Sequence, residues 1–385
     1  MSWFKKTQPT QESPIIIFNI GGATVSGLVL DSRSRDLLFE TREDLPFNST
    51  QDFSVATRQT TKTLSDISQR LKRFVSEDPQ QVHCLLSSAW HIADSRKIRV
   101  KTQTKNKSVL EDITSEGLRR HLTLHQTPSY QLTPIDSLIL GLELDGQRHT
   151  NLDFSLPGEK TVHHFSSSSD ANLLNSLREP IRSGFGQSET QFHSGLLSTF
   201  AVLKETMANH HDFVILDIGG EVTDLVIVRG QTIIDIASIP VGTHSIARQI
   251  SKLTGQNNHS AYSSLHLLGE NIIQNHRHND FSNYLANIKN EWLYSLASIL
   301  EQYEKPGENL PVVVVGDDKS AVVLSGWLKD LPDHQPIVAD SEFLADHYPT
   351  KRPPSRVPSH LLAQLFAQKY LWYTSVVLLV APSTL

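Results

Sequence analysis

Two segments of the chain share one pattern, and this repeat constrains the fold more than any other feature. Residues 15–30 read IIIFNIGGATVSGLVL, and residues 213–228 read FVILDIGGEVTDLVIV. In each copy an apolar strand ends in Asn or Asp, Ile-Gly-Gly follows, and a second apolar strand continues. A Gly-Gly pair between β-branched runs marks a tight turn with positive φ or close backbone approach. We therefore expect two similar lobes that face each other.

The glycine turns have a chemical interpretation. Successive backbone N–H groups at such a turn form a concavity that grips phosphate oxygens, because no Cβ holds the phosphate away. In the second copy, Asp217 at the mouth can hold Mg²⁺ through waters, while Asp224 or the Thr223 hydroxyl can orient an attacking water. The alternative for either copy alone is a plain glycine-rich hairpin. The duplication favours phosphate binding, with Asp217 and Asp224 as candidate catalytic residues.

Composition and charge exclude several classes of protein. The 385 residues exceed what one core of roughly 250–300 residues can organise, so we expect more than one domain. The formal charge of −6 argues against non-specific nucleic-acid binding, which depends on a basic excess. Cys84 is the single cysteine, so no disulfide framework is possible. The polar start lacks the apolar stretch of a signal peptide, which predicts a cytoplasmic protein.

Histidines are numerous but suggest no metal site. The pairs at 163–164 and 210–211 lack the accompanying Cys or carboxylate spacing of a metal centre. We interpret them as solvated loop histidines.

The order of expected elements divides the chain into eight parts. The inserted part is expected to hold a strand at 81–87, a helix at 113–125 and strands at 137–143 and 154–165. The parts are a disordered N-terminal tail (1–14), the first lobe core (15–80), the inserted strand-helix-strand-strand subdomain (81–165), the connecting helices of the first lobe (166–210), the second lobe core (211–255), a helical subdomain (256–308), more of the second lobe core (309–348), and a C-terminal helix returning to the first lobe plus an apolar tail (349–385).

At this point the residues resemble a known family. Asp-Ile-Gly-Gly-Glu-Val-Thr-Asp at 217–224, followed by Ile-Pro-Val-Gly at 239–242, resembles the second phosphate loop of the bacterial cell-division actin homologue FtsA and its relative PilM. Residues 195–203 stand where that family has the helix connecting its lobes, and the insert stands where it has an extra subdomain. The resemblance, from about 15 to 371, implies an α/β two-lobed actin-like ATPase fold of duplicated ribonuclease-H-like domains.

The resemblance also implies an ATP and Mg²⁺ site between the lobes. Asp217 is the implied metal ligand. The implied nucleotide-binding residues are Asn19, Gly21, Gly22, Gly219, Gly220, Thr223, Gly242 and Gly316.

Several positions depart from the family pattern. Asn19 replaces the aspartate of the first loop, and Ser194 or His193 stands where the family has the Glu or Gln that polarises water. Tyr262 and Leu265 replace an acidic and basic pair. The adenosine loop at 316–320 has one glycine and two carboxylates. Because metal charge and water orientation act mainly in the transition state, we expect hydrolysis to be weak or absent while some nucleotide binding remains.

These features predict an adaptor that works by binding and polymerisation. The expected function is that of an FtsA-like protein of bacterial cell division, which tethers division proteins at the inner face of the cell membrane. Its expected partners are a tubulin-like division protein or other divisome proteins, and copies of itself in filaments or dimers. The alternatives are a PilM-like pilus-assembly protein, an inactive scaffold without nucleotide, and a small-molecule kinase of the same superfold. The apolar tail at 372–379 is expected to contact membrane or another subunit.

Overall fold

The computed structural model describes residues 13–46, 52–75, 77–100, 107–128, 130–149, 158–269, 279–305, 307–316, 319–331, 334, 336–347 and 355–371. Three predictions lie outside these residues: the N-terminal tail up to position 12, the two carboxylates at 317–318, and the apolar tail after Leu371.

The first lobe is built on a five-stranded mixed sheet. The order is β3-β2-β1-β4-β9. Strands β1 (Ile15–Ile20), β2 (Thr24–Leu30) and β3 (Leu37–Asp44) are antiparallel neighbours, whereas β1, β4 (Gln81–Leu86) and β9 (Glu189–Ser194) run parallel. The apolar, β-branched residues of β1 suit a central strand covered on both faces.

The second lobe repeats this sheet strand for strand. Its order is β12-β11-β10-β13-β14. Here β10 (Phe213–Ile218), β11 (Thr223–Arg229) and β12 (Thr232–Ile239) form the antiparallel part, and β13 (Val312–Val315) and β14 (Pro336–Val338) extend it in parallel. The prediction of an α/β fold with two similar lobes is therefore confirmed.

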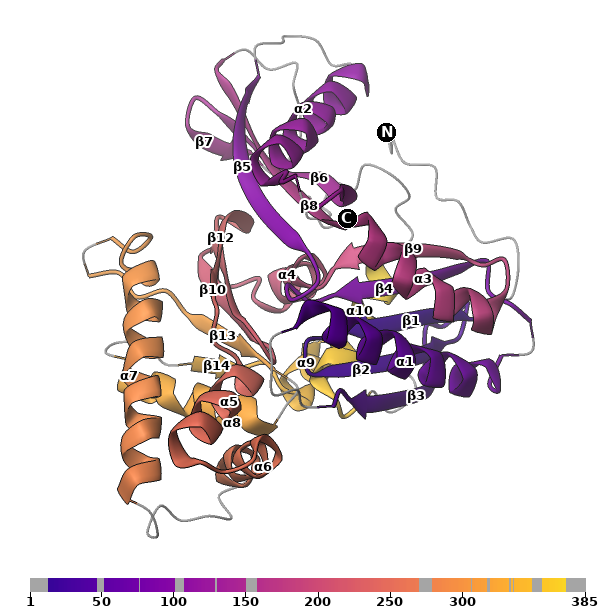
Figure 1. The fold of residues 1–385 in the computed structure, drawn as a ribbon. Helices are drawn as coiled ribbons and strands as arrows, with labels where there is room; N and C mark the ends of the chain where they lie inside the picture. The colour runs from indigo at the N-terminus through magenta and orange to yellow at the C-terminus, as the bar shows by residue number, and fades with distance from the viewer. Residues whose placement is uncertain are drawn as a thin grey trace.

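Helices cover both faces of each sheet (Figure 1). On the first sheet, α1 and α3 pack over one face, and α4 and α10 lie on the face toward the second lobe. Helices α5 to α8 cover the outer face of the second sheet. No helix within the described ranges is long and apolar enough to cross a membrane. The bounds are α1 (Phe53–Lys72), α3 (Ala171–Phe185), α4 (Gly195–Thr206), α5 (Thr243–Thr254), α6 (Asn258–Gly269), α7 (Asn279–Leu300), α8 (Lys319–Trp327), the 3-10 turn Leu328–Asp330, α9 (Ser341–His347) and α10 (Pro358–Lys369).

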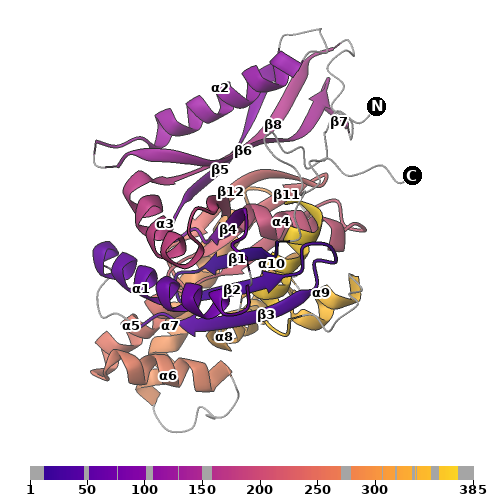
Figure 2. The same cartoon turned by 90° about the vertical axis from the view of Figure 1, so that its right-hand side faces the viewer.

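The inserted subdomain stands above the two lobes. It is a four-stranded antiparallel sheet of order β5-β8-β6-β7, with α2 lying along one face (Figure 2). Strand β5 also packs against β12 of the second lobe, and the Ser95 hydroxyl donates to the Ile233 carbonyl at 2.7 Å. The insert therefore contacts both lobes. Its elements are β5 (Ile92–Val100), α2 (Lys107–His125), β6 (Leu132–Leu144), β7 (Gln147–His149) and β8 (Lys160–Asp170).

Two predictions about the insert are wrong. The strand at 81–87 does not open it, because β4 pairs in parallel with β1 in the first lobe. The opening strand is β5, whose sequence IADSRKIRV is too polar to stand out as a strand. His163 and His164 are not in a solvated loop either, because both lie in β8 and are 1% exposed.

Candidate functional site

The two glycine turns close with the same backbone geometry. The Gly21 amide donates to the Thr24 carbonyl at 2.8 Å, and the Gly219 amide donates to the Val222 carbonyl at 2.9 Å. Each turn joins the first two strands of its sheet, so the repeat seen in the sequence is also a repeat in structure.

These turns meet at the junction of the lobes. A Cβ placed on Gly220 would lie 2.8 Å from the Ala23 Cβ and 3.1 Å from the carbonyl carbon of Gly22. Only glycine permits such an approach of two backbones. The first turn is held in place by Trp90, whose Nε1 donates to the Gly21 carbonyl at 2.9 Å. The two turns therefore converge on one interlobe cleft.

A cavity of about 100 Å³ lies in this cleft. Most of the predicted site residues line it: Asn19, Gly21, Gly22, Asp217, Gly219, Gly220 and Gly316. Helix α4 contributes Gly195, Ser198 and Thr199, and α10 contributes Ser359, Leu362 and Ala363. Nothing in the sequence marks the α10 residues, because they reach the cleft only when the end of the chain returns to the first lobe.

Three predicted site residues do not line the cleft. Thr223 pairs with Ile218 on the core side of the sheet, where its hydroxyl donates to the Val241 carbonyl at 2.6 Å and accepts from Trp292 Nε1 at 3.3 Å. Asp224 is 3% exposed and accepts hydrogen bonds from the hydroxyls of Ser238 and Ser88. Burial raises the pKa of this carboxyl, against the lowering effect of the two serines. The pairing of Asp224 with serines from both lobes indicates a structural position.

Gly242 supports the second turn from behind. A Cβ there would lie 2.5 Å from the Gly219 carbonyl oxygen. The first amides of α5 donate to the turn, Thr243 to the Gly219 carbonyl at 3.1 Å and His244 to the Gly220 carbonyl at 2.7 Å. The N-terminus of α5 therefore holds the turn in place, and these two amides are used within the protein.

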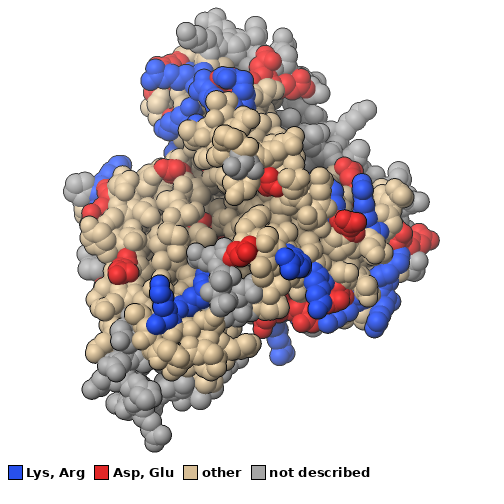
Figure 3. Space-filling view, in the orientation of Figure 1, with Lys and Arg blue, Asp and Glu red and all other residues tan. Residues whose placement is uncertain are grey.

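The α4 wall of the cleft carries no acid. Ser194 is fully buried and caps α4, with its hydroxyl 2.8 Å from His91 Nε2. His193 lies 3.2 Å from His83 and 3.5 Å from Asp136, away from the cleft. Among the described lining residues, Asp217 is the one carboxylate and Arg42 the one cationic side chain. On the face drawn in Figure 3, the surface around the lobe junction is largely uncharged.

The groups that line the cleft suit the phosphates of a nucleotide, but the cavity is too small for a whole nucleotide. Two glycine turns and Asp217 suit phosphate oxygens with a hydrated Mg²⁺. Small-molecule pockets usually measure about 300–1,000 Å³, whereas this cavity measures about 100 Å³. In this arrangement Gly220 abuts Ala23 of the opposite turn. A whole nucleotide therefore does not fit the cavity in this arrangement of the lobes.

Comparisons with known proteins identify the fold. No family model matches the sequence, and no curated protein matches it significantly. The chain is similar to a solved chain of a PilM–PilN type IV pilus biogenesis complex, with 15% identity, a TM-score of 0.67, and coverage of 94% of this chain and 99% of that one. A weaker structural likeness is to the cytoplasmic domain of EpsL, an inner membrane component of the Vibrio cholerae type II secretion system, with 11% identity, a TM-score of 0.39, and coverage of 96% of this chain and 99% of that one. Another is to MreB 5 of Spiroplasma citri bound to AMPPNP, with 13% identity, a TM-score of 0.43, and coverage of 87% of this chain and 93% of that one. The chain has the α/β actin-like ATPase fold.

Proposed function

We propose that this chain is a PilM-like adaptor, which holds a protein partner of a pilus-assembly machinery at the inner face of the cell membrane. The observation that carries the proposal is the similarity to the PilM chain over nearly the whole of both proteins, at a TM-score of 0.67. That chain was solved in a complex with PilN. The similarity supports the pilus-assembly alternative better than the division role expected from the sequence.

The chemistry of the cleft supports a binding protein. Asn19 brings no charge to a cation, and the α4 wall has small residues where the family pattern calls for a group that polarises water. Groups that act on the transition state are therefore missing, while glycine turns that can bind phosphate remain. We expect ATP to bind weakly through the turns and Asp217 after the lobes separate, with little turnover.

The location of the protein and its self-association are also proposals. A cytoplasmic location follows from the adaptor role, and self-association into dimers or filaments is compatible with it. Nucleic acid is not an expected partner, because the net charge of −6 offers no basic excess.

The test is co-purification from the native cell. The full chain carries a tag, the membrane fraction is solubilised in mild detergent, and bound proteins are identified against an untagged strain. We expect a membrane protein of a pilus assembly to be retained equally by the wild type and by Asp217→Ala. Retention of a tubulin-like division protein instead would support the division role.

Turnover measurements separate the adaptor from an enzyme. We expect phosphate release with Mg²⁺ and ATP to stay near the level of the Asp217→Ala variant. Robust magnesium-dependent hydrolysis that Asp217→Ala abolishes would contradict the adaptor proposal and support an ATPase.

A further inference from the structure

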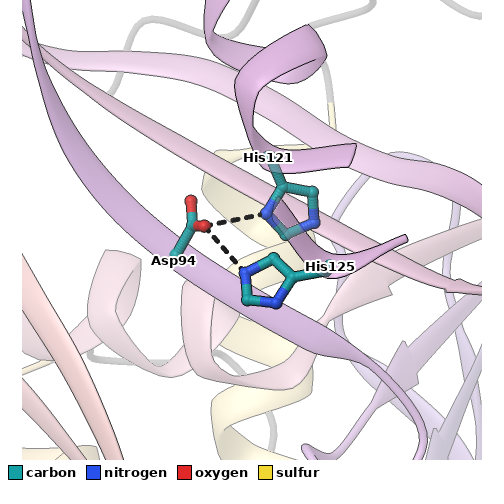
Figure 4. A group of neighbouring side chains, drawn as sticks. All are labelled: Asp94, His121 and His125. Carbon is teal, nitrogen blue, oxygen red and sulfur yellow. Dashed lines mark hydrogen bonds and ion pairs between the residues drawn. The ribbon is translucent and has the colours of Figure 1, made fainter. Parts of the chain in front are cut away.

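The inserted subdomain contains a cluster of metal-ligating side chains far from the glycine turns. Asp94 lies on β5, and His121 and His125 lie one helical turn apart near the end of α2 (Figure 4). Residues four apart share one face of a helix, so both imidazoles point toward the strand. The three side chains converge because α2 packs across the sheet that contains β5.

We propose that Asp94, His121 and His125 form a binding site for a transition-metal ion of the zinc class. His121 Nδ1 and His125 Nε2 each lie 3.1 Å from the same Asp94 oxygen, Oδ2. The three ligand atoms all lie within 4.8 Å of one another. Zinc bonds of about 2.0–2.2 Å in a tetrahedron separate neighbouring ligand atoms by roughly 3.4 Å. Small outward shifts would therefore accommodate an ion.

The contacts around His121 and Asp94 are a second indication of a ligand site. The His121 side chain is fully buried, and its Nε2 lies 2.7 Å from the Ser168 hydroxyl. Its Nδ1 faces Asp94 Oδ2 at 3.1 Å without the geometry of a hydrogen bond, and the buried Oδ1 of Asp94 has no hydrogen-bond partner. Buried polar atoms are almost always satisfied, so an unpartnered carboxylate oxygen beside two imidazoles points to a ligand at this place. Metal-binding histidines typically have a hydrogen-bond partner on the other ring nitrogen, as Ser168 is for His121, and this partner fixes the ring so that the ligating nitrogen points inward.

The ligand set selects the class of ion. Two imidazoles and one carboxylate suit zinc and neighbouring transition metals, whereas calcium and magnesium prefer oxygen ligands alone. Three protein ligands leave a fourth position for water. His125 is 26% exposed, so an ion could enter from solvent on its side.

Arg96 is the competitor for the site. Its Nε and Nη2 lie 3.0 and 2.9 Å from Asp94 Oδ2, the oxygen that the two imidazoles face. A cation must share this oxygen with the guanidinium or displace it, and Arg96 is exposed enough (29%) to turn toward solvent. The proposal therefore makes an unusual prediction: removing Arg96 should strengthen metal binding.

The experiment titrates Zn²⁺ into the metal-free full chain by calorimetry and records Co²⁺ absorption as a check on coordination. We expect one equivalent of zinc and the visible bands of tetrahedral cobalt. His125→Ala and the shape-preserving Asp94→Asn should each weaken zinc binding by at least tenfold, as loss of a ligand does, and Arg96→Gln should tighten it several-fold. Circular dichroism confirms that each variant is folded.

The control is the exposed pair His210 and His211, which could bind zinc adventitiously. Replacing both by alanine should leave the affinity unchanged. The proposal is overturned if zinc binding is lost in this double variant, if His125→Ala binds as tightly as the wild type, or if Arg96→Gln binds no more tightly than the wild type.

Discussion

Ser88 and Asp224 belong to different lobes, and the Ser88 hydroxyl donates a hydrogen bond to the Asp224 carboxylate. Ser88 follows β4 of the first lobe, and Asp224 lies in β11 of the second. The other carboxylate oxygen accepts from Ser238 at 2.6 Å within the second lobe. One buried carboxylate is thus bound from both sides of the cleft, next to the place where the turns meet. A separation of the lobes at this point would break the bond from Ser88.

Replacing each serine separately tests this relationship. Ser88→Ala and Ser238→Ala each remove one hydrogen bond to Asp224 and should each lower stability by about 1–2 kcal/mol. Only Ser88→Ala should also loosen the lobes, because only that bond crosses the junction. We expect faster hydrogen exchange at the Gly21 and Gly219 amides in Ser88→Ala. Equal exchange in the two variants would contradict an interlobe role.

Asn19→Asp should make ATP binding depend on magnesium. Asn19 and Asp217 are the next-to-last residues of the corresponding strands β1 and β10 and line the same cleft, so the substitution places a second carboxylate there. In the wild type we expect ATP affinity to change little with Mg²⁺. In Asn19→Asp, magnesium should tighten binding about tenfold, or about 1.4 kcal/mol. Titration of labelled ATP with and without Mg²⁺ measures this. A strong magnesium effect in the wild type would contradict the interpretation of Asn19, and Asn19→Ala is the uncharged control.

Buried His164 should make the protein sensitive to acid. Burial lowers the pKa of His164 from 6.5 to about 4, so the unfolded chain takes up a proton before the folded one does. Its contribution to stability is therefore complete above pH 6.5 and is lost as the pH falls toward 4. The loss should approach about 3 kcal/mol near pH 4.

Comparison with His164→Gln isolates this contribution, because buried His83, His91 and His163 also have pKa values lowered by burial. Urea unfolding between pH 4.5 and 7 should show a smaller pH dependence in His164→Gln than in the wild type. Exposed His259→Gln should follow the wild type. Parallel curves for all three proteins would rule out this role of His164.

Gly117→Ala should be destabilising, although alanine is the better helix former. A Cβ on Gly117 of α2 would lie 2.3 Å from His164 Nδ1 and 2.5 Å from its Cε1. The buried ring cannot move away freely, so we expect a loss of about 1–3 kcal/mol. Gly326 of α8 has no atom within 4 Å of the corresponding position. Gly326→Ala should therefore be neutral or stabilising by up to about 1 kcal/mol. Thermal unfolding of both variants measures the contrast, and a stable Gly117→Ala would contradict the packing of α2 on β8.

The glycine turns and the strands before them are features that local sequence pattern predicts correctly. The apolar runs of β1 and β10 and the glycines after them are read from neighbouring residues, because strand burial and turn geometry depend on short-range chemistry. The same reasoning misplaced Thr223. Residues of a strand alternate between its faces, and only the packing of Trp292 shows which face is core.

The insert shows the opposite case. Because β5 is polar and β4 is apolar, the prediction from sequence took β4 as the first strand of the insert. The pairing of β4 with β1, over sixty residues away, places it in the sheet of the first lobe instead. The His121–His125 spacing is visible in the sequence, but Asp94 joins it only through the packing of α2 on β5.

The sequence by itself determined the duplicated lobes and the two glycine turns, since these arise from residues adjacent along the chain. Tertiary structure decided that the turns touch, that Asp224 joins the lobes instead of facing the cleft, and that α10 closes one wall. Those outcomes depend on contacts between distant segments, whose free energy is gained only when the whole chain packs.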